Sequence, residues 1–165
     1  MEQKWDRVCV GDERIRRVVT KYSKSLTRLA FTYLRNVHDV EDVAQEVFLA
    51  YLRSAPAFLS EEHEKAWLIR VTINRCKNQL KSGWFRARRP LPEDLSYLME
   101  QESELLRAVM ALPEKYRLPI HLHYYEGYAI KEIAQILGEK SATIGTRLAR
   151  GRDLLKARMG GIFDA

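Results

Sequence analysis

Apolar residues recur at helical spacing along most of the chain, and no segment alternates convincingly with a period of two. The first apolar stripe predicts a long amphipathic helix over residues 13–35. A second stripe predicts a helix over residues 39–53. Its expected core-facing positions are Val40, Val43, Ala44, Val47, Phe48, Tyr51 and Leu52. A third helix is expected over residues 65–82, and the chain is again helical from residue 102. The pattern therefore predicts an all-α fold.

Turn-forming residues between the stripes indicate where the helices and domains end. Asp39 is expected to cap the second helix, and residues 54–56 to terminate it at a proline. A polar loop is expected at residues 60–64. Residues 83–101 contain two prolines and an abrupt change in charge sign, which is typical of a flexible linker. We expect two small helical domains, residues 1–82 and 102–165, joined by this linker.

The second helix carries a polar face rich in acids opposite its apolar stripe. This face comprises Asp39, Glu41, Asp42, Gln45 and Glu46. A solvated helix with acids in its first turn, where the helix dipole favours them, is one interpretation. It accounts well for Asp39, Glu41 and Asp42 and less well for Glu46. A protein-binding face is the alternative.

Charge is distributed in blocks, although the chain as a whole carries a net +6. Residues 36–64 hold seven acids and one base, whereas residues 66–92 hold seven bases and no acid. Residues 140–158 hold six bases and one acid. Two basic blocks separated by acids suggest two contacts with polyanions, although a solvated basic face would explain either block alone.

Composition excludes several other classes of protein. A 46% hydrophobic content is that of a globular chain, and no apolar run reaches the ~18 residues of a membrane span. The N-terminus lacks a signal-peptide core, so we expect a cytoplasmic protein without membrane insertion. Cys9 and Cys76 lie far apart in the sequence, so we expect no structural disulfide and no zinc site. No cofactor or metal is expected.

Residues 128–155 have the pattern of a helix-turn-helix. Ile130, Ile133, Ala134 and Leu137 are expected to face inward on the first helix, and Ile144, Leu148, Gly151 and Leu155 on the second. Gly138 permits the turn, and Ser141 is expected to cap the second helix. Outward residues suited to a major groove and its phosphates are Lys140, Thr143, Thr146, Arg147 and Arg150. An ordinary helical hairpin is the alternative.

A second candidate nucleic-acid surface lies on the third helix. Cations and amides share its polar face, and an aromatic residue borders them, a combination suited to phosphates and stacked bases. The residues are Trp67, Arg70, Asn74, Lys77, Asn78 and Lys81. Because basic solvated helices are common, this pattern alone leaves both interpretations open.

Taken together, residues 22–157 resemble a bacterial RNA polymerase sigma factor of the extracytoplasmic-function (ECF) group. The resemblance is carried by five motifs, at residues 39–48, 66–75, 111–117, 124–134 and 142–152. Their order and spacing are more specific than any one of them.

The resemblance implies a partner for each unusual surface. The acidic face would bind core RNA polymerase, with Asp42, Gln45 and Glu46 as partners for arginine. The loop from Ser60 and the helix from Trp67 to Lys81 would bind the melted −10 element, where the family flips a base into a protein pocket. The helix over residues 141–157 would read the −35 element of promoter DNA. The family is usually held inactive by an anti-sigma factor, often a membrane protein.

The chain departs from the family pattern at a few positions. Asn78 stands where aspartate is usual, Gly145 where a base is common, and Gly151 where alanine is common. Pro119 falls within an apparent helix and is expected to kink it. One of the glutamates near residue 62 could accept a hydrogen bond from cytosine, and the others are expected to stay in solvent.

Two other functions compete with the sigma-factor interpretation. A stand-alone helix-turn-helix regulator would use the C-terminal unit but would leave the acidic helix unexplained. An enzyme is not expected, since His121 and His123 are two residues apart and make a poor metal pair on a helix. No phosphate-cradling glycine loop is present.

Overall fold

The computed structural model describes residues 2–34, 36–81 and 104–160, with side chains from residue 13 onward. All the regular structure in these ranges is helical, as the sequence predicts. The chain divides into two compact units, with the boundary after Pro90. The expected linker, residues 83–101, lies outside the described residues.

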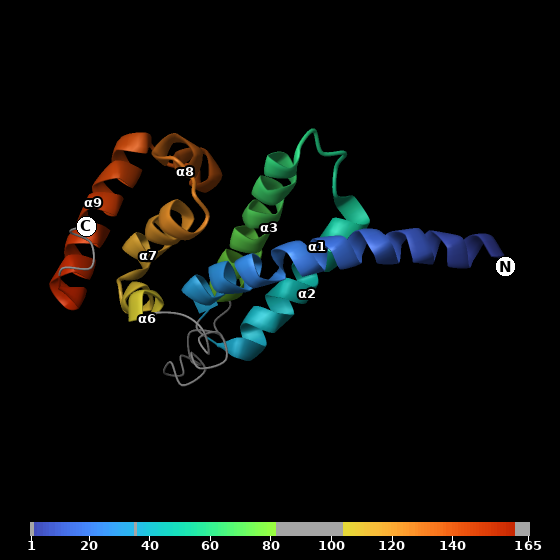
Figure 1. The fold of residues 1–165 in the computed structure, drawn as a ribbon, viewed down its shortest axis with the longest axis horizontal. Helices are drawn as coiled ribbons and strands as arrows, with labels where there is room; N and C mark the ends of the chain where they lie inside the picture. Colours follow the sequence, from blue (N-terminus) through green and yellow to red (C-terminus); the bar gives the residue numbers. More distant parts are fainter. Residues whose placement is uncertain (1, 35, 82–103, 161–165) are drawn as a thin grey trace. The chain divides into compact units, whose positions relative to one another are not determined.

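The first unit is built from three helices, in which α1 (Glu2–Leu34) packs against both α2 (Val37–Ser54) and α3 (Glu61–Lys81) (Figure 1). Apolar side chains from all three helices meet in one core. Its buried members include Val18, Leu26, Leu29, Phe31, Val40, Val43, Val47, Tyr51, Leu68, Ile69 and Cys76. The hydroxyls of Thr32 and Thr72 are also buried. Each donates a hydrogen bond to a backbone carbonyl one turn earlier in its own helix, so neither needs a hydrogen-bond acceptor from another helix.

Several boundaries in this unit differ from those predicted. Helix α1 begins at Glu2 rather than near residue 13. Asn36, not Asp39, caps α2, because the Asn36 side chain accepts a hydrogen bond from the Asp39 amide at 3.2 Å. Helix α2 ends at Ser54, as expected. Helix α3 starts four residues early, so all of the predicted polar loop at 60–64 except Ser60 is its first turn.

The second unit places α9 (Ser141–Met159) against α6 (Glu104–Met110), α7 (Glu114–Ile120) and α8 (Ile130–Leu137) (Figure 1). Pro119 lies within α7 and does not end the helix. The next five residues, His121–Tyr125, form a π-helical turn. Helix α7 is therefore followed by a wider turn, a feature that is often seen at functional sites, and the kink at Pro119 stays a prediction.

The helix-turn-helix is formed by α8, a turn at Gly138 and α9. Gly138 has φ 64°, a left-handed conformation that glycine adopts at little cost, so the predicted turn is confirmed. Ser141 is the first residue of α9 rather than its cap, which is Lys140. The four predicted inward positions of α9 are all buried, whereas Ile130 of α8 is 37% exposed, contrary to prediction.

Helices α7 and α9 approach closely at Gly151. A methyl group at this position would lie 2.8 Å from Cγ1 of Ile120 and 3.5 Å from Cβ of Tyr116. The contact with Ile120 is shorter than packed carbon atoms allow, whereas the one with Tyr116 is an ordinary van der Waals distance. Glycine at 151, where alanine is common in the family, therefore permits the observed spacing of the two helices.

Candidate protein and nucleic-acid interfaces

Helix α2 presents its acids to solvent along one side. Glu41, Asp42, Gln45 and Glu46 are all exposed. Asp39 is half-buried instead, and its carboxylate accepts a hydrogen bond from Gln79 of α3 at 3.3 Å. Asp39 therefore helps to join two helices, while the other four side chains remain available on the surface.

Two leucines extend this acidic face toward the end of α2. Leu49 and Leu52 are 47% and 50% exposed. Leu52 was expected in the core, and the prediction is wrong because the buried stripe ends at Tyr51 one residue earlier. Glu46 is followed at i+3 by Leu49, so acids and leucines share one side of the helix. A surface of this kind can bind a partner that is both basic and apolar.

Helix α3 carries the predicted row of polar side chains on its outer side. Arg70, Asn74, Lys77, Asn78 and Lys81 are all exposed, on the side opposite the buried residues. Arg75 lies 3.8 Å from Glu46 of α2, the outer limit of an ion pair. The row therefore offers cations and amides to a nucleic-acid strand along most of the helix.

The start of α3 is fixed by its own side chains. Ser60 precedes the helix and its hydroxyl accepts a hydrogen bond from the His63 amide at 3.1 Å, the geometry of an N-cap. The His63 ring in turn accepts from the Leu59 amide at 3.3 Å. Leu59 itself is 94% exposed. Ser60, a predicted DNA contact, thus also shapes the loop in which it lies.

An aromatic cluster supports this loop from beneath. The ring of Phe58 stacks on Tyr51, and the centroids lie 6.1 Å apart. Trp67 meets both rings edge-on, at 6.1 Å from Tyr51 and 5.9 Å from Phe58. Trp67 is half-buried, so part of its indole faces solvent beside the basic row of α3. It can present a face to an unpaired base.

Glu64 is the residue that the sequence interpretation placed most wrongly. It was expected near solvent or DNA, but its side chain is only 7% exposed. Arg17 of α1 donates to both carboxylate oxygens, at 3.3 and 2.9 Å, and the Tyr51 hydroxyl donates at 2.8 Å. Arg14 donates to that same hydroxyl at 3.1 Å. This network, here called the Glu64 network, ties together all three helices of the first unit.

The electrostatic environment of Glu64 has two opposing effects. Burial raises the pKa of the carboxyl, whereas the hydrogen bonds from Arg17 and Tyr51 lower it, and the net pKa is lowered. For Tyr51, burial and then the hydrogen bond to Glu64 raise the phenol pKa. The network is therefore a carboxylate with a neutral phenol and two arginines at neutral pH.

On the second unit, the predicted DNA-facing residues lie along one side of the helix-turn-helix. Lys140, Thr146 and Arg150 are exposed, and Thr143 and Arg147 are half-buried. The Thr146 hydroxyl donates to the Ala142 carbonyl at 3.0 Å. Arg147 pairs with Glu139, across the turn, at 2.7 Å. Glu139 was not anticipated, and it holds a predicted phosphate ligand in place.

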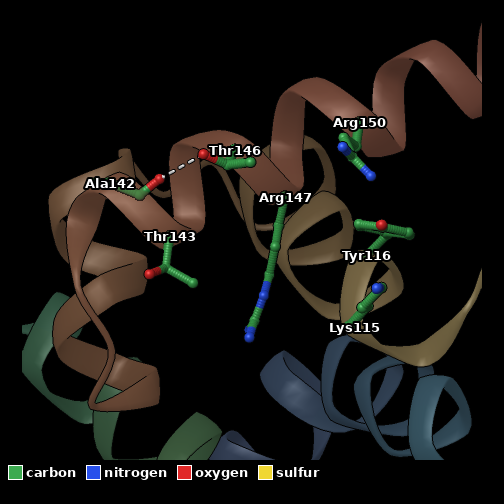
Figure 2. Close-up of a pocket in the computed structure, with 7 residues that line it drawn as sticks. All are labelled: Lys115, Tyr116, Ala142, Thr143, Thr146, Arg147 and Arg150. Atoms are coloured by element: carbon green, nitrogen blue, oxygen red, sulfur yellow. Dashed lines mark hydrogen bonds between the residues drawn. The ribbon is translucent and has the colours of Figure 1, made fainter.

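An open groove of about 490 Å³ runs beside helix α9. Five of its residues, including Thr146 and Arg150, come from α9, while Lys115 and Tyr116 come from the start of α7 (Figure 2). Its described lining holds three cations, Lys115, Arg147 and Arg150, and no carboxylate. The sequence interpretation missed the α7 residues, since they lie outside the helix-turn-helix pattern.

The histidines make contacts within the fold. His121 is fully buried, stacks on Tyr125 with centroids 5.3 Å apart, and lies 3.5 Å from Glu126. His123 Nδ1 lies 2.8 Å from the Tyr128 carbonyl. Across the described parts of the chain, no group of three histidine, cysteine or acidic side chains could hold a metal ion.

Comparison with known proteins identifies both units. Residues 18–86 match the family model of sigma-70 region 2, and residues 102–155 match that of sigma-70 region 4.

Within the described residues, no helix is long and apolar enough to cross a membrane.

Curated relatives cover most of the chain. It is 28% identical over 162 residues to the ECF RNA polymerase sigma factor SigW of Bacillus subtilis, covering 86% of this chain and 87% of that protein. It is 29% identical over 151 residues to the sigma factor SigV of the same organism, covering 86% and 88%.

Two solved structures share the fold. The sigma factor RpoE of Bartonella quintana, solved with the anti-sigma factor NepR, superposes with a TM-score of 0.68 at 18% identity, covering 88% of this chain and 96% of that one. CnrH, solved with the cytosolic domain of CnrY, gives 0.65 at 23% identity, covering 90% and 88%. Together, the region 2 and region 4 matches in their expected order show that this chain belongs to the sigma-70 family of RNA polymerase sigma factors, in its ECF group.

Proposed function

We propose that this chain binds core RNA polymerase and directs it to promoters by recognising a −10 and a −35 element. The observation that carries the proposal is that one three-helix unit bears both an exposed acidic side on α2 and an exposed basic row on α3. A stand-alone duplex-binding regulator needs the helix-turn-helix but has no use for the acidic side. A polymerase subunit uses the acidic side of α2, the basic row of α3 and the helix-turn-helix.

The polymerase would be bound by Glu41, Asp42, Gln45 and Glu46, with Asp39 at the edge. Exposed carboxylates pair well with arginine, and charge complementarity speeds association. The neighbouring Leu49 and Leu52 would add apolar area, which supplies affinity that charged pairs in water do not.

The melted −10 element would lie along α3. Arg70, Lys77 and Lys81 suit the backbone of a single strand, while Asn74 and Asn78 suit base edges. Trp67 offers a stacking surface, and Ser60 lies in the loop held by the aromatic cluster. Because the loop is fixed by its cap and by His63, its contacts would be formed before DNA arrives, which lowers the entropic cost of binding.

The −35 duplex would be read by α9. Arg150 and Thr146 are exposed toward the side that would enter the major groove. An arginine can donate to O6 and N7 of one guanine, the commonest specific contact of this type. Lys140, Thr143 and Arg147 suit the flanking phosphates, and their affinity would fall with added salt.

An anti-sigma factor is the proposed regulator. Two proteins of this fold, CnrH and RpoE, were solved with partners, in the second case a named anti-sigma factor. An inhibitor covering the acidic side of α2 would block polymerase binding directly. The proposed site of action is the cytoplasm, where the polymerase is, and the role is that of a binding subunit rather than an enzyme.

Run-off transcription tests the proposal. Purified core polymerase, free of sigma factors, is mixed with this protein and fragmented host DNA, and the transcript starts are sequenced. We expect discrete starts that depend on the protein and share two upstream elements. Starts that are the same without it would refute the proposal.

Charge reversal separates a sigma factor from a stand-alone regulator. Asp42→Lys should abolish the complex with core polymerase on gel filtration while leaving the helical content unchanged. Glu13→Lys, an exposed acid of α1, is the matched control and should retain the complex. A retained complex with Asp42→Lys would favour the regulator.

The anti-sigma proposal has its own test. Each protein encoded beside this chain is added to the run-off reaction. We expect one of them, or its cytoplasmic part, to suppress transcription and to form a complex that Asp42→Lys weakens. If none inhibits, the regulatory part of the proposal fails while promoter recognition stands.

A further inference from the structure

The groove beside α9 is lined by two helices. Arg147 and Arg150 belong to α9, while Lys115 and Tyr116 belong to α7 (Figure 2). The proposed −35 contacts all lie within residues 140–150, so neither α7 residue is among them. A duplex bound to α9 would nevertheless pass beside α7, because the two helices share this groove.

The charges that line the groove are all positive. Its described lining holds Lys115, Arg147 and Arg150 and no carboxylate. Arg147 pairs with Glu139 at 2.7 Å, but Glu139 is not one of the lining residues. A concave surface of one charge sign concentrates ions of the opposite sign, and the DNA backbone carries a negative charge at every phosphate. The groove therefore suits a stretch of phosphates better than an apolar or a basic ligand.

The packing of α7 on α9 places Lys115 beside this groove. Its ammonium lies 4.9 Å from the centroid of the Tyr116 ring, within the range of a cation–π contact. The ring is well packed, since Tyr116 is only 8% exposed. The same residue lies against α9, where a methyl group at Gly151 would come within 3.5 Å of the Tyr116 Cβ atom. Lys115 itself is exposed, so its charge remains accessible from solvent.

We propose that Lys115 is a further contact of the −35 interface: its ammonium binds a backbone phosphate of the duplex that lies in the groove between α7 and α9. The inference rests on the proposed −35 function of α9. An ammonium binds phosphate as a point charge and reads no base, so Lys115 adds affinity and helps to fix the register of α9 on the duplex. Its contact with the Tyr116 ring restricts the lysine before binding, which lowers the entropic cost.

The salt dependence of binding tests for this contact. Core polymerase is reconstituted with the full chain as wild type, Lys115→Gln and Lys115→Arg. The dissociation constant is measured at several salt concentrations on a short duplex. This duplex carries a −35 element mapped by run-off transcription and ends before the −10 element. Arg107→Gln, which removes a cation from an exposed position of α6 outside the groove lining, is the matched control.

We expect Lys115→Gln to weaken binding about three- to tenfold at low salt, and about equally on every −35 sequence, because one phosphate contact is lost. The slope of log affinity against log salt should fall by about 0.9, so the loss should shrink about 3.5-fold between about 50 and 200 mM salt. Lys115→Arg keeps the charge and the cation–π contact and should preserve most of the slope. Arg107→Gln should leave the slope unchanged, although it alters the net charge by the same amount.

Neutral phosphates locate the contact on the DNA. A methylphosphonate, which removes the charge of one phosphate, replaces each backbone phosphate of the −35 element in turn. Wild type should lose affinity at several positions. Lys115→Gln should become insensitive at one of them, because the protein partner of that phosphate is already gone. That position should adjoin the one at which Arg147→Gln becomes insensitive, since both side chains line the same groove.

Two outcomes would overturn the role of Lys115 alone. One is a wild type that prefers the mapped −35 element to a scrambled duplex while Lys115→Gln keeps the full salt slope. A folding defect would lower the affinity alike at all salt concentrations, so it counts with this outcome. The other is a Lys115→Gln variant that stays sensitive at every phosphate, which would mean that its charge acts only at long range. If the wild-type holoenzyme does not prefer the −35 element at all, recognition by α9 fails, and this inference with it.

Discussion

The Glu64 network predicts a large difference between two glutamates in the same turn of α3. Glu64 and Glu61 each pair with a cation of α1, Arg17 at 2.9 Å and Lys21 at 2.7 Å. Only Glu64 is buried, with a side chain 7% exposed against 73% for Glu61. Replacing each with glutamine removes the charge while keeping the shape.

The expected magnitudes follow from burial. The bond from the Tyr51 hydroxyl to the Glu64 carboxylate is buried and charge-assisted, and is worth about 1.5–3 kcal/mol. The Arg17 contribution is discounted to about 0.5 kcal/mol because its side chain is 49% exposed. Glu64→Gln should therefore lower the free energy of unfolding by up to about 2–3.5 kcal/mol. Glu61→Gln should lower it by about 0.5 kcal/mol or less.

Tryptophan fluorescence during urea unfolding is a suitable assay. Trp67 lies in α3 of the first unit, so in a chain with Trp5→Phe and Trp84→Phe the signal reports that unit alone. This separation matters because a two-unit chain need not unfold in one step. If the two variants shift the unfolding free energy equally, the network does not stabilise the unit as argued.

The pH dependence of the unfolding free energy gives an independent check that the charge of Glu64 is stabilising. The folded pKa of Glu64 is lowered below its ordinary value of about 4.5. The stabilisation by its charge is then fully present above the unfolded pKa and is lost as the pH falls through the folded one. The difference between wild type and Glu64→Gln should be constant near pH 7 and shrink below about pH 4.5.

Three further predictions concern other parts of the fold. Gly151→Ala should destabilise the second unit by about 1 kcal/mol, since overpacking against Ile120 exceeds the gain in helix propensity. Thermal unfolding followed by circular dichroism measures the loss, and an unchanged or higher midpoint would contradict the close approach of α7 and α9. In a Cys9→Ser chain, Cys76 should react with a thiol reagent only after denaturant is added, because burial raises the pKa of its thiol to about 12; rapid labelling of the native chain would contradict this. Glu139→Gln should release Arg147 from its 2.7 Å ion pair and remove a negative charge beside the proposed phosphate contacts. The affinity for duplex DNA should therefore rise about two- to fivefold at low salt. An unchanged affinity would place Arg147 away from DNA.

Helical periodicity was enough to predict the faces of α3 and α9. Every predicted outward residue of the α3 row is exposed, and the four inward residues of α9 are buried. Both results depend on spacing within one helix, which the sequence contains in full. The turn at Gly138 was predicted for a similarly local reason, the backbone freedom of glycine.

The errors arose where a distant residue or a helix boundary decides the outcome. Glu64 was misplaced because its partners are 47 and 13 residues away in sequence. A signal was available: Glu64 is four residues before Leu68 and continues the buried stripe of α3 once that helix begins at Glu61. Lys115 and Tyr116 were missed because only the packing of α7 on α9 brings them beside the recognition helix.

The position of Tyr51 has a mechanical consequence for the first unit. Tyr51 lies on the buried side of α2, with Glu41 and Asp42 on the exposed side of the same helix. Its hydroxyl donates a hydrogen bond to Glu64, in the first turn of α3. Ser60 caps that turn and ends the loop before it. Tyr51 therefore joins the helix that carries the acidic side to the first turn of α3, so a change at this one phenol would disturb the support of both surfaces.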